Sequence, residues 1–98
     1  MNRARFLEEA EAEFLKEVLY YADVQAKGAE RFRMAIEEAA ARALAFPMAG
    51  QPYRSKTRRV FVKGYPFFLV YRPETEGVAI LAVVHEARRP GYWLSRAR

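Results

Sequence analysis

The run from Val78 to Val84 restricts the fold of this chain more than any other feature, because it contains no polar residue. A strand with one face in water alternates apolar and polar side chains, so an unbroken run is typical of a strand covered on both faces. The segment from Pro73 to Gly77 precedes the run as a turn, and a polar, basic segment follows from His85. The sequence therefore predicts a central strand with packing on both sides.

Two segments before this run predict its neighbouring strands. Arg59 to Lys63 reads basic, Val, Phe, Val, basic, and Phe67 to Tyr71 is aromatic and aliphatic. Between them, Gly64 and Pro66 mark a turn. We expect these two segments to pair antiparallel and to form, with the central strand, a three-stranded antiparallel meander.

The first half of the chain has the period of helices. Apolar residues recur at steps of three and four from Leu7 to Tyr21 and again from Ala29 to Phe46. Lys27-Gly28 separates the two stripes, and Pro47 ends the second. This pattern predicts a helical hairpin.

In chain order, these segments predict an α+β fold with the order β-α-α-β-β-β. The N-terminal strand is predicted at residues 1–6, where Arg3 and Arg5 alternate with Ala4 and Phe6. A chain of 98 residues has room for one core of ordinary size. We therefore expect a single domain over residues 1–98, with the helical hairpin packed on one face of the sheet.

Several kinds of chemistry are disfavoured by what the sequence lacks. There is no cysteine, which disfavours disulfides and zinc-cysteine sites. His85 is the only histidine, and no acidic cluster with ligand spacing lies beside it, so we expect neither a metal nor a cofactor. The N-terminus has no apolar secretory segment, and no apolar run approaches the ~18 residues of a membrane span. We expect a cytoplasmic protein that does not enter the membrane.

The net charge of +5 is unevenly distributed. Residues 1–50 carry seven basic against nine acidic side chains, a net charge of −2, whereas residues 51–98 carry ten against three, a net charge of +7. A positive field of this kind accelerates encounters with nucleic acid, ribosomes or an acidic peptide without selecting among them. A solvated basic face that only maintains solubility is the alternative.

The element order, the size and several short motifs together resemble the RelE/ParE superfamily, the toxins of type II toxin–antitoxin systems that include plasmid stabilisation proteins. The resemblance spans nearly the whole chain. The motifs that carry it are Tyr20-Tyr21 on the first helix, Phe46-Pro47 after the second, Gly64-Tyr65-Pro66-Phe67 in the hairpin and the ending His85-Glu86-Ala87-Arg88-Arg89-Pro90-Gly91-Tyr92-Trp93.

This resemblance implies a cognate antitoxin that binds and neutralises the chain in a toxin–antitoxin hetero-oligomer. It also implies one of two targets. RelE-like members cut messenger RNA on the ribosome as mRNA interferases, whereas ParE-like members inhibit growth by binding DNA gyrase. A domain that kept the fold without toxicity, as an adaptor or nucleic-acid-binding module, is a third alternative, because fold alone does not decide function.

A nuclease of this kind needs a proton carrier and cationic side chains beside the phosphate, and requires no metal. RelE-like nucleases carry basic side chains at two strand positions that are Phe61 and Phe68 in this sequence, which favours the ParE-like alternative and leaves open whether the chain is an enzyme at all. The candidate catalytic residues, should it be a nuclease, are Arg59, Lys63, Arg72, His85 and Arg88. The candidate target-binding residues are Arg58, Arg59, Arg88, Arg89 and Tyr92.

Each singled-out aromatic or histidine also has a structural interpretation. His85 suits proton transfer near neutral pH, but it equally suits a cap at the end of the last strand. Trp93 is more consistent with the core than with a binding surface, whereas both interpretations stay open for Tyr92. Tyr20 and Tyr21 are expected to pack on the first helix.

Overall fold

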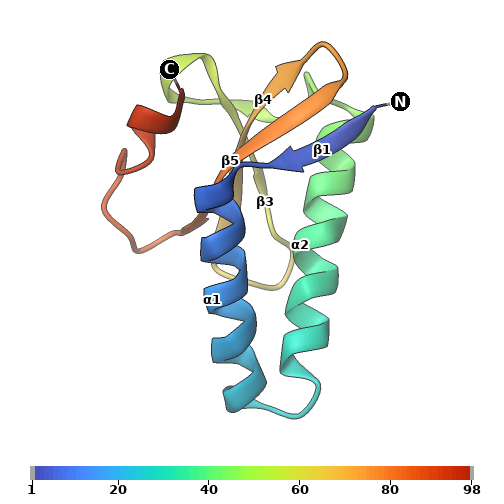
Figure 1. The fold of residues 1–98 in the computed structure, drawn as a ribbon, viewed down its shortest axis with the longest axis vertical. Helices are drawn as coiled ribbons and strands as arrows, with labels where there is room; N and C mark the ends of the chain where they lie inside the picture. The colour runs from blue at the N-terminus through green and yellow to red at the C-terminus, as the bar shows by residue number, and fades with distance from the viewer. Residues whose placement is uncertain (1, 98) are drawn as a thin grey trace.

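The computed structural model describes residues 2–97, which form one sheet with two helices on one of its faces (Figure 1). The predicted α+β class and element order are confirmed. The helices and strands are, in chain order, β1 (Arg3–Phe6), α1 (Glu8–Val24), α2 (Gly28–Ala45), β2 (Gln51–Pro52), β3 (Arg58–Phe61), β4 (Phe67–Glu74) and β5 (Gly77–His85), with short 3-10 helices at η1 (Arg54–Lys56) and η2 (Leu94–Ala97).

The sheet has five strands in the order β1-β5-β4-β3-β2. β5, which contains the long apolar run, lies between β4, its antiparallel partner, and β1, its parallel partner. β1 pairs only with the first half of β5, from Gly77 to Ile80. Both faces of β5 are covered, and every residue from Gly77 to Val84 is buried.

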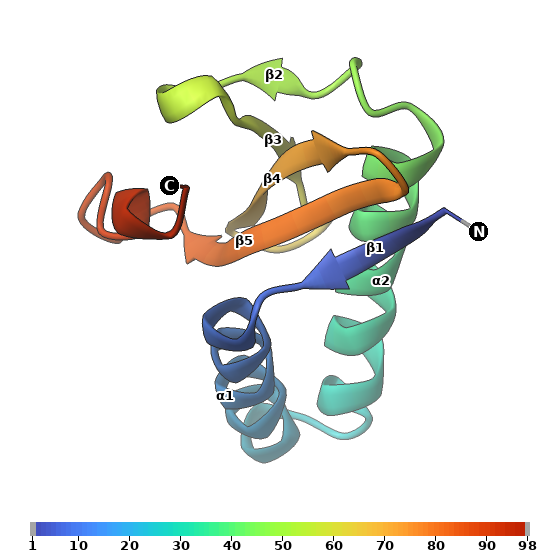
Figure 2. The same ribbon diagram turned by 45° about the horizontal axis from the view of Figure 1, so that its top comes forward.

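The helical hairpin covers one face of the sheet, as Figure 2 shows from above. Phe32 of α2 is fully buried, and its ring lies 4.7 Å from that of Tyr21 and 5.4 Å from that of Phe67. Gly28 permits the close turn between the helices, because a Cβ at this position would lie 2.1 Å from the carbonyl oxygen of Tyr21. We call the cluster between hairpin and sheet the helix-side core.

The opposite face of the sheet, which we call the open face, is partly covered by residues 86–97, here called the tail. Trp93 is fully buried there and packs with Val70, Leu81 and Val84 in a second cluster. An irregularity in the β4–β5 register places both Leu81 and Ala82 in this cluster. The prediction that Trp93 belongs to the core is confirmed.

The structure differs from the sequence predictions at three places. Pro73 and Glu74 belong to β4 and not to the following turn; the proline is tolerated because β3 pairs with β4 only as far as Tyr71, which leaves one side of the strand free. The two-residue strand β2 was not predicted. Tyr20 was expected to pack, but its side chain is 57% exposed.

Candidate functional site

The centre of the uncovered part of the open face is an aromatic pair. Phe61 of β3 lies directly opposite Phe68 of β4, and the two ring centroids are 5.8 Å apart. Both point to the open face, because their neighbours Val62 and Leu69 lie in the helix-side core. Phe68 is buried and Phe61 is 45% exposed.

Arg59 lies over this pair. Its guanidinium carbon is 5.1 Å from the ring centroids of Phe61 and Phe68 and 4.4 Å from that of Tyr53. Its Nε donates a hydrogen bond to Oε1 of Gln51 at 2.5 Å. Three aromatic faces and one amide therefore fix the guanidinium in place by cation–π attraction and hydrogen bonding, without a carboxylate.

The loop that contains η1 holds Tyr53 in position. The amide of Tyr53 donates to the carbonyl of Thr57, whose buried hydroxyl donates to the carbonyl of Arg54. The ring of Tyr53 stacks on Trp93 of the tail at 5.6 Å. Gly91 has a φ of 83°, and a Cβ there would lie 2.5 Å from Nη1 of Arg54, so the loop and the tail fit closely against each other.

A hollow of about 170 Å³ opens between this loop, the sheet and the start of the tail. Its lining brings together three of the predicted site residues, Arg59, His85 and Arg88. The other residues of the lining are Tyr53, Phe68, Val84, Glu86, Pro90 and Trp93.

Glu13 of α1 fastens the tail to the rest of the protein. Its carboxylate accepts hydrogen bonds from the hydroxyl of Tyr92 at 2.7 Å and from Arg96 at 3.0 Å. It also accepts the backbone N–H of Val83 at 3.0 Å. Arg96 donates in addition to the carbonyl of Leu81. Beyond the end of β1, these side chains thus form hydrogen bonds with backbone groups of β5 that have no strand partner on that edge.

Tyr92 is half-buried between cations. The guanidinium of Arg88 lies 3.8 Å from its ring centroid and that of Arg96 lies 5.3 Å away. Burial, together with the hydrogen bond to the Glu13 carboxylate, raises the pKa of Tyr92 well above its ordinary value. The hydroxyl is therefore a neutral donor to Glu13 at physiological pH.

His85 ends β5 with a local hydrogen bond. Its Nδ1 accepts the backbone N–H of Ala87 at 3.0 Å, and its ring meets the edge of Phe67 at 5.0 Å. Both contacts belong to a strand cap, the structural interpretation that the sequence also allowed.

The remaining predicted site residues lie away from the hollow's lining. Arg72 donates to the carbonyl of Ala97 and so holds the end of the tail. Arg58 donates to the carbonyls of Met48 and Gly50 on the loop after α2. Lys63 is exposed on the turn after β3, and Arg89 is exposed in the irregular first part of the tail. Of the five predicted nuclease residues, the structure therefore brings Arg59, His85 and Arg88 to the hollow and places Lys63 and Arg72 elsewhere.

Sequence reasoning missed Glu13, Arg96 and Tyr53. Glu13 sits among other glutamates at the start of α1, which indicated only a favourable helix N-terminus. Its side chain is only 16% exposed, which distinguishes it in the structure from its exposed neighbours Glu9 and Glu11. No local pattern identifies a partner such as Arg96, which is far away in the chain.

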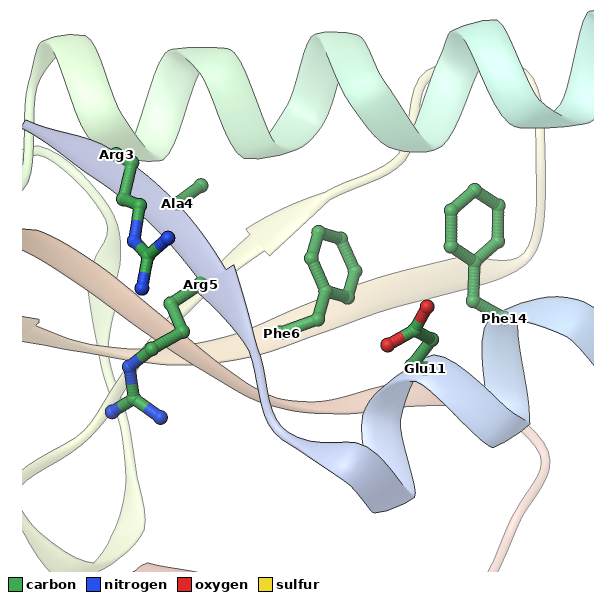
Figure 3. A pocket seen from close by; sticks show the side chains of 6 residues that line it. All are labelled: Arg3, Ala4, Arg5, Phe6, Glu11 and Phe14. Carbon is green, nitrogen blue, oxygen red and sulfur yellow. The ribbon is translucent and has the colours of Figure 1, made fainter.

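A second hollow, of about 320 Å³, follows the free edge of β1 (Figure 3). Its apolar part is formed by Phe6 and Phe14, whose rings stack at 5.7 Å. Arg3 and Arg5 extend away from these rings, on the other side of β1. β1 has a strand partner on one side only, so backbone groups along its other edge are open to pairing.

In the part of the chain that the structure describes, no group of His, Asp or Glu side chains is placed to hold a metal ion. None of the described helices is long and apolar enough to cross a membrane.

Comparisons with known proteins agree with this fold and place it in a family. The solved structure of a chromosomal ParDE toxin–antitoxin system from P. aeruginosa contains a similar chain, with a TM-score of 0.65 and 19% sequence identity over 87% of this chain and 96% of that one. This similarity shows the class of fold, a ParE-like α+β fold. The model of the ParE toxin family of type II toxin–antitoxin systems, parDE, matches residues 4–90, and the chain belongs to that family. No curated protein matches it.

Proposed function

We propose that this chain is a growth-inhibiting toxin that binds DNA gyrase and is neutralised by a cognate antitoxin. In this proposal residues 1–98 are one toxin domain, which acts in the cytoplasm and is stored as a toxin–antitoxin hetero-oligomer. The target-binding residues are Arg88, Arg89 and Tyr92 of the tail, together with Arg58 and Arg59 of β3.

The observation that carries the choice of gyrase is the Phe61–Phe68 pair. The two rings stand opposite each other at the positions where the RelE-like pattern has basic side chains. An aromatic ring stacks on a base, but it does not neutralise the charge that develops on a phosphate during cleavage. Arg72 is engaged in a hydrogen bond to the tail, and His85 caps the end of β5. Because two of the five candidate catalytic side chains already have structural roles, the surface is better suited to binding than to catalysis.

Exposed apolar side chains on α1 support an antitoxin partner. Leu15, Leu19, Tyr20 and Val24 are each more than half exposed, which is unusual for an isolated domain and typical of a surface that a partner covers. The free edge of β1, with Arg3 and Arg5 beside it, suits an extended acidic segment of the same partner. Such an antitoxin would cover both features at once.

Pulse labelling just after induction tests the target. We expect thymidine incorporation to fall before methionine incorporation, and purified protein to inhibit supercoiling by gyrase. Arg88→Ala combined with Arg89→Ala should weaken the inhibition, whereas Arg31→Ala combined with Arg33→Ala, which removes the same charge from α2, should not. An earlier fall of methionine incorporation would identify the ribosome as the target, and unaffected growth would contradict toxicity itself.

Co-expression tests the antitoxin. The product of a neighbouring gene should relieve growth arrest and co-purify with the chain. Leu19→Glu on α1 should weaken this complex, because it places a charge on the covered surface. Ala41→Glu, which adds the same charge at an exposed position of α2, is the control. Equal weakening by both variants would argue against a partner on α1.

A further inference from the structure

Two arginines that line the small hollow on the open face have no carboxylate partner. Among the described residues, the ion pairs are Arg5–Glu74, Arg42–Glu38 and Arg96–Glu13, so neither Arg59 nor Arg88 is neutralised. Both are instead held against aromatic rings, Arg59 over Tyr53 and Arg88 over Tyr92. Their positive charge therefore remains available to an anionic ligand, and their orientation is fixed before the ligand arrives.

An exposed aromatic ring lies beside two residues of the hollow's lining, Arg59 and Phe68. Phe61 is 45% exposed and its ring is within cation–π distance of the Arg59 guanidinium. A half-exposed phenylalanine beside a fixed guanidinium offers two flat surfaces on which a planar group can stack. Phe68 and Trp93 lie beneath and are buried, so the floor of the hollow is rigid.

We propose that this surface binds single-stranded nucleic acid, with one base stacked on Phe61 and an adjacent phosphate between Arg59 and Arg88. At about 170 Å³ the hollow is smaller than the roughly 300–1,000 Å³ of ordinary small-molecule sites, but it suits a single base or phosphate. This site shares Arg59 and Arg88 with the proposed contact with gyrase, but binding to it requires neither gyrase nor cleavage of the strand.

The chemistry of the rim favours nucleic acid over an acidic peptide. Glu86 also lines the hollow, and its carboxylate repels a second negative charge. One phosphate beside an uncharged base meets less of this repulsion than a run of carboxylates does. Duplex DNA is disfavoured because its bases are stacked on each other and do not present a free face to Phe61.

The test is titration of a fluorescein-labelled oligothymidylate into the purified chain, followed by anisotropy and by the fluorescence of Trp93, the only tryptophan. Because Trp93 lies under the floor of the hollow, a ligand bound there should change its fluorescence. Phe61→Ala should lower the affinity roughly tenfold, as expected for the loss of one stacked base. Arg59→Gln should lower both the affinity and the dependence on salt concentration.

Matched controls separate this site from non-specific attraction to a basic protein. Phe46→Ala removes a phenylalanine that is 67% exposed on another surface, and Arg33→Gln removes one exposed charge from α2. Both should leave the affinity within about twofold of the original. Equal losses in all four variants, or equal affinity for a duplex of the same sequence, would overturn the proposal. So would competition by a polyglutamate peptide at the same concentration of charge.

Circular dichroism of each variant guards against misfolding. Phe61 is the exposed last residue of the short strand β3, so its replacement should leave the melting curve nearly unchanged. Phe61→Tyr retains an aromatic ring and should restore binding. Failure of this variant to restore binding, with the fold intact, would also contradict a stacking role. None of these outcomes depends on gyrase, so the two proposals fail independently.

Discussion

The two faces of the sheet bury the same kinds of side chains but are held by different means. On the helix side, fourteen buried residues form one cluster; they come from both helices, from β3, β4 and β5, and from Val62 just after β3. On the open face the corresponding cluster has seven, of which only Trp93 comes from the tail. The tail therefore relies on polar contacts through Glu13, Arg72 and Arg96. This difference implies that the hairpin determines whether the chain folds, whereas the tail can detach from a sheet that remains folded.

The largest expected effect is at Phe32, where the rings of both helices and of the β3–β4 hairpin meet. Phe32→Ala should destabilise the whole protein by about 3–5 kcal/mol, because it leaves a cavity in a fully buried cluster. Urea unfolding followed by far-UV circular dichroism measures this loss, and Phe32→Leu is a milder variant that keeps the protein folded.

Trp93→Ala is the matched change on the open face. It removes an equally buried aromatic side chain, but we expect a smaller loss of global stability, since the tail detaches before the sheet unfolds. Trypsin should then cleave after Arg88, since Pro90 protects the bond after Arg89, while residues 2–85 stay intact. A loss as large as that of Phe32→Ala, without selective cleavage, would mean that both faces unfold together.

The next effect is at Glu13, the acceptor that joins the tail to α1. Glu13→Gln keeps the side-chain length but leaves Arg96, which is 15% exposed, without its negative partner. The expected cost is about 1.5–3 kcal/mol, the range for hydrogen bonds to charged groups. Glu17→Gln on the same helix is the control, and its effect should be small. A double-mutant cycle of Glu13→Gln with Arg96→Met measures the coupling between the two.

Much of the fold could be predicted from the sequence because its signals are local. The apolar stripes from Leu7 to Tyr21 and from Ala29 to Phe46 repeat with the period of a helix. The apolar run from Val78 to Val84 has no polar residue, which by itself predicts a strand covered on both faces. β2 could not be predicted, because two residues are too few to show the alternation of a strand. They form a strand only because they pair with β3.

The candidate site was harder to predict, because it depends on contacts between distant segments. The sequence identified Phe61 and Phe68 as interior positions of neighbouring strands, and they do face each other. It did not reveal that Tyr53 would cover Arg59. It also assigned Arg72 to a possible active site, whereas the structure uses it to bind the carbonyl of Ala97. An arginine looks the same in the sequence whether its partner is a substrate or its own chain.

A pH titration sharpens the comparison further, because Tyr92 belongs to the tail and its pKa is raised in the folded state. A group with a raised folded-state pKa stabilises the fold below its ordinary value of 10.0, and this stability is lost as the pH rises above that value. The tail should therefore detach at alkaline pH, as measured by trypsin cleavage and Trp93 fluorescence. Tyr92→Phe should reduce this dependence on pH, whereas Tyr71→Phe in the helix-side core should leave detachment of the tail unchanged.

The smallest effect is expected for the ion pair of Arg5 and Glu74, which crosses β5 on the part of the open face that the tail leaves uncovered. Hydrogen bonding to Arg5 lowers the pKa of Glu74, so the pair stabilises the fold above the ordinary value of 4.5 and loses this contribution as the pH falls. The side chains are 41% and 33% exposed, so solvent and salt screen the attraction and Glu74→Gln should cost no more than about 1 kcal/mol. Added salt should reduce even this cost, whereas the cost of Glu13→Gln should persist, since its pair is shielded by the tail. Equal costs for the two variants would mean that the tail gives Glu13 no protection from solvent, and the polar attachment of the tail would then be too weak to explain its position on the sheet.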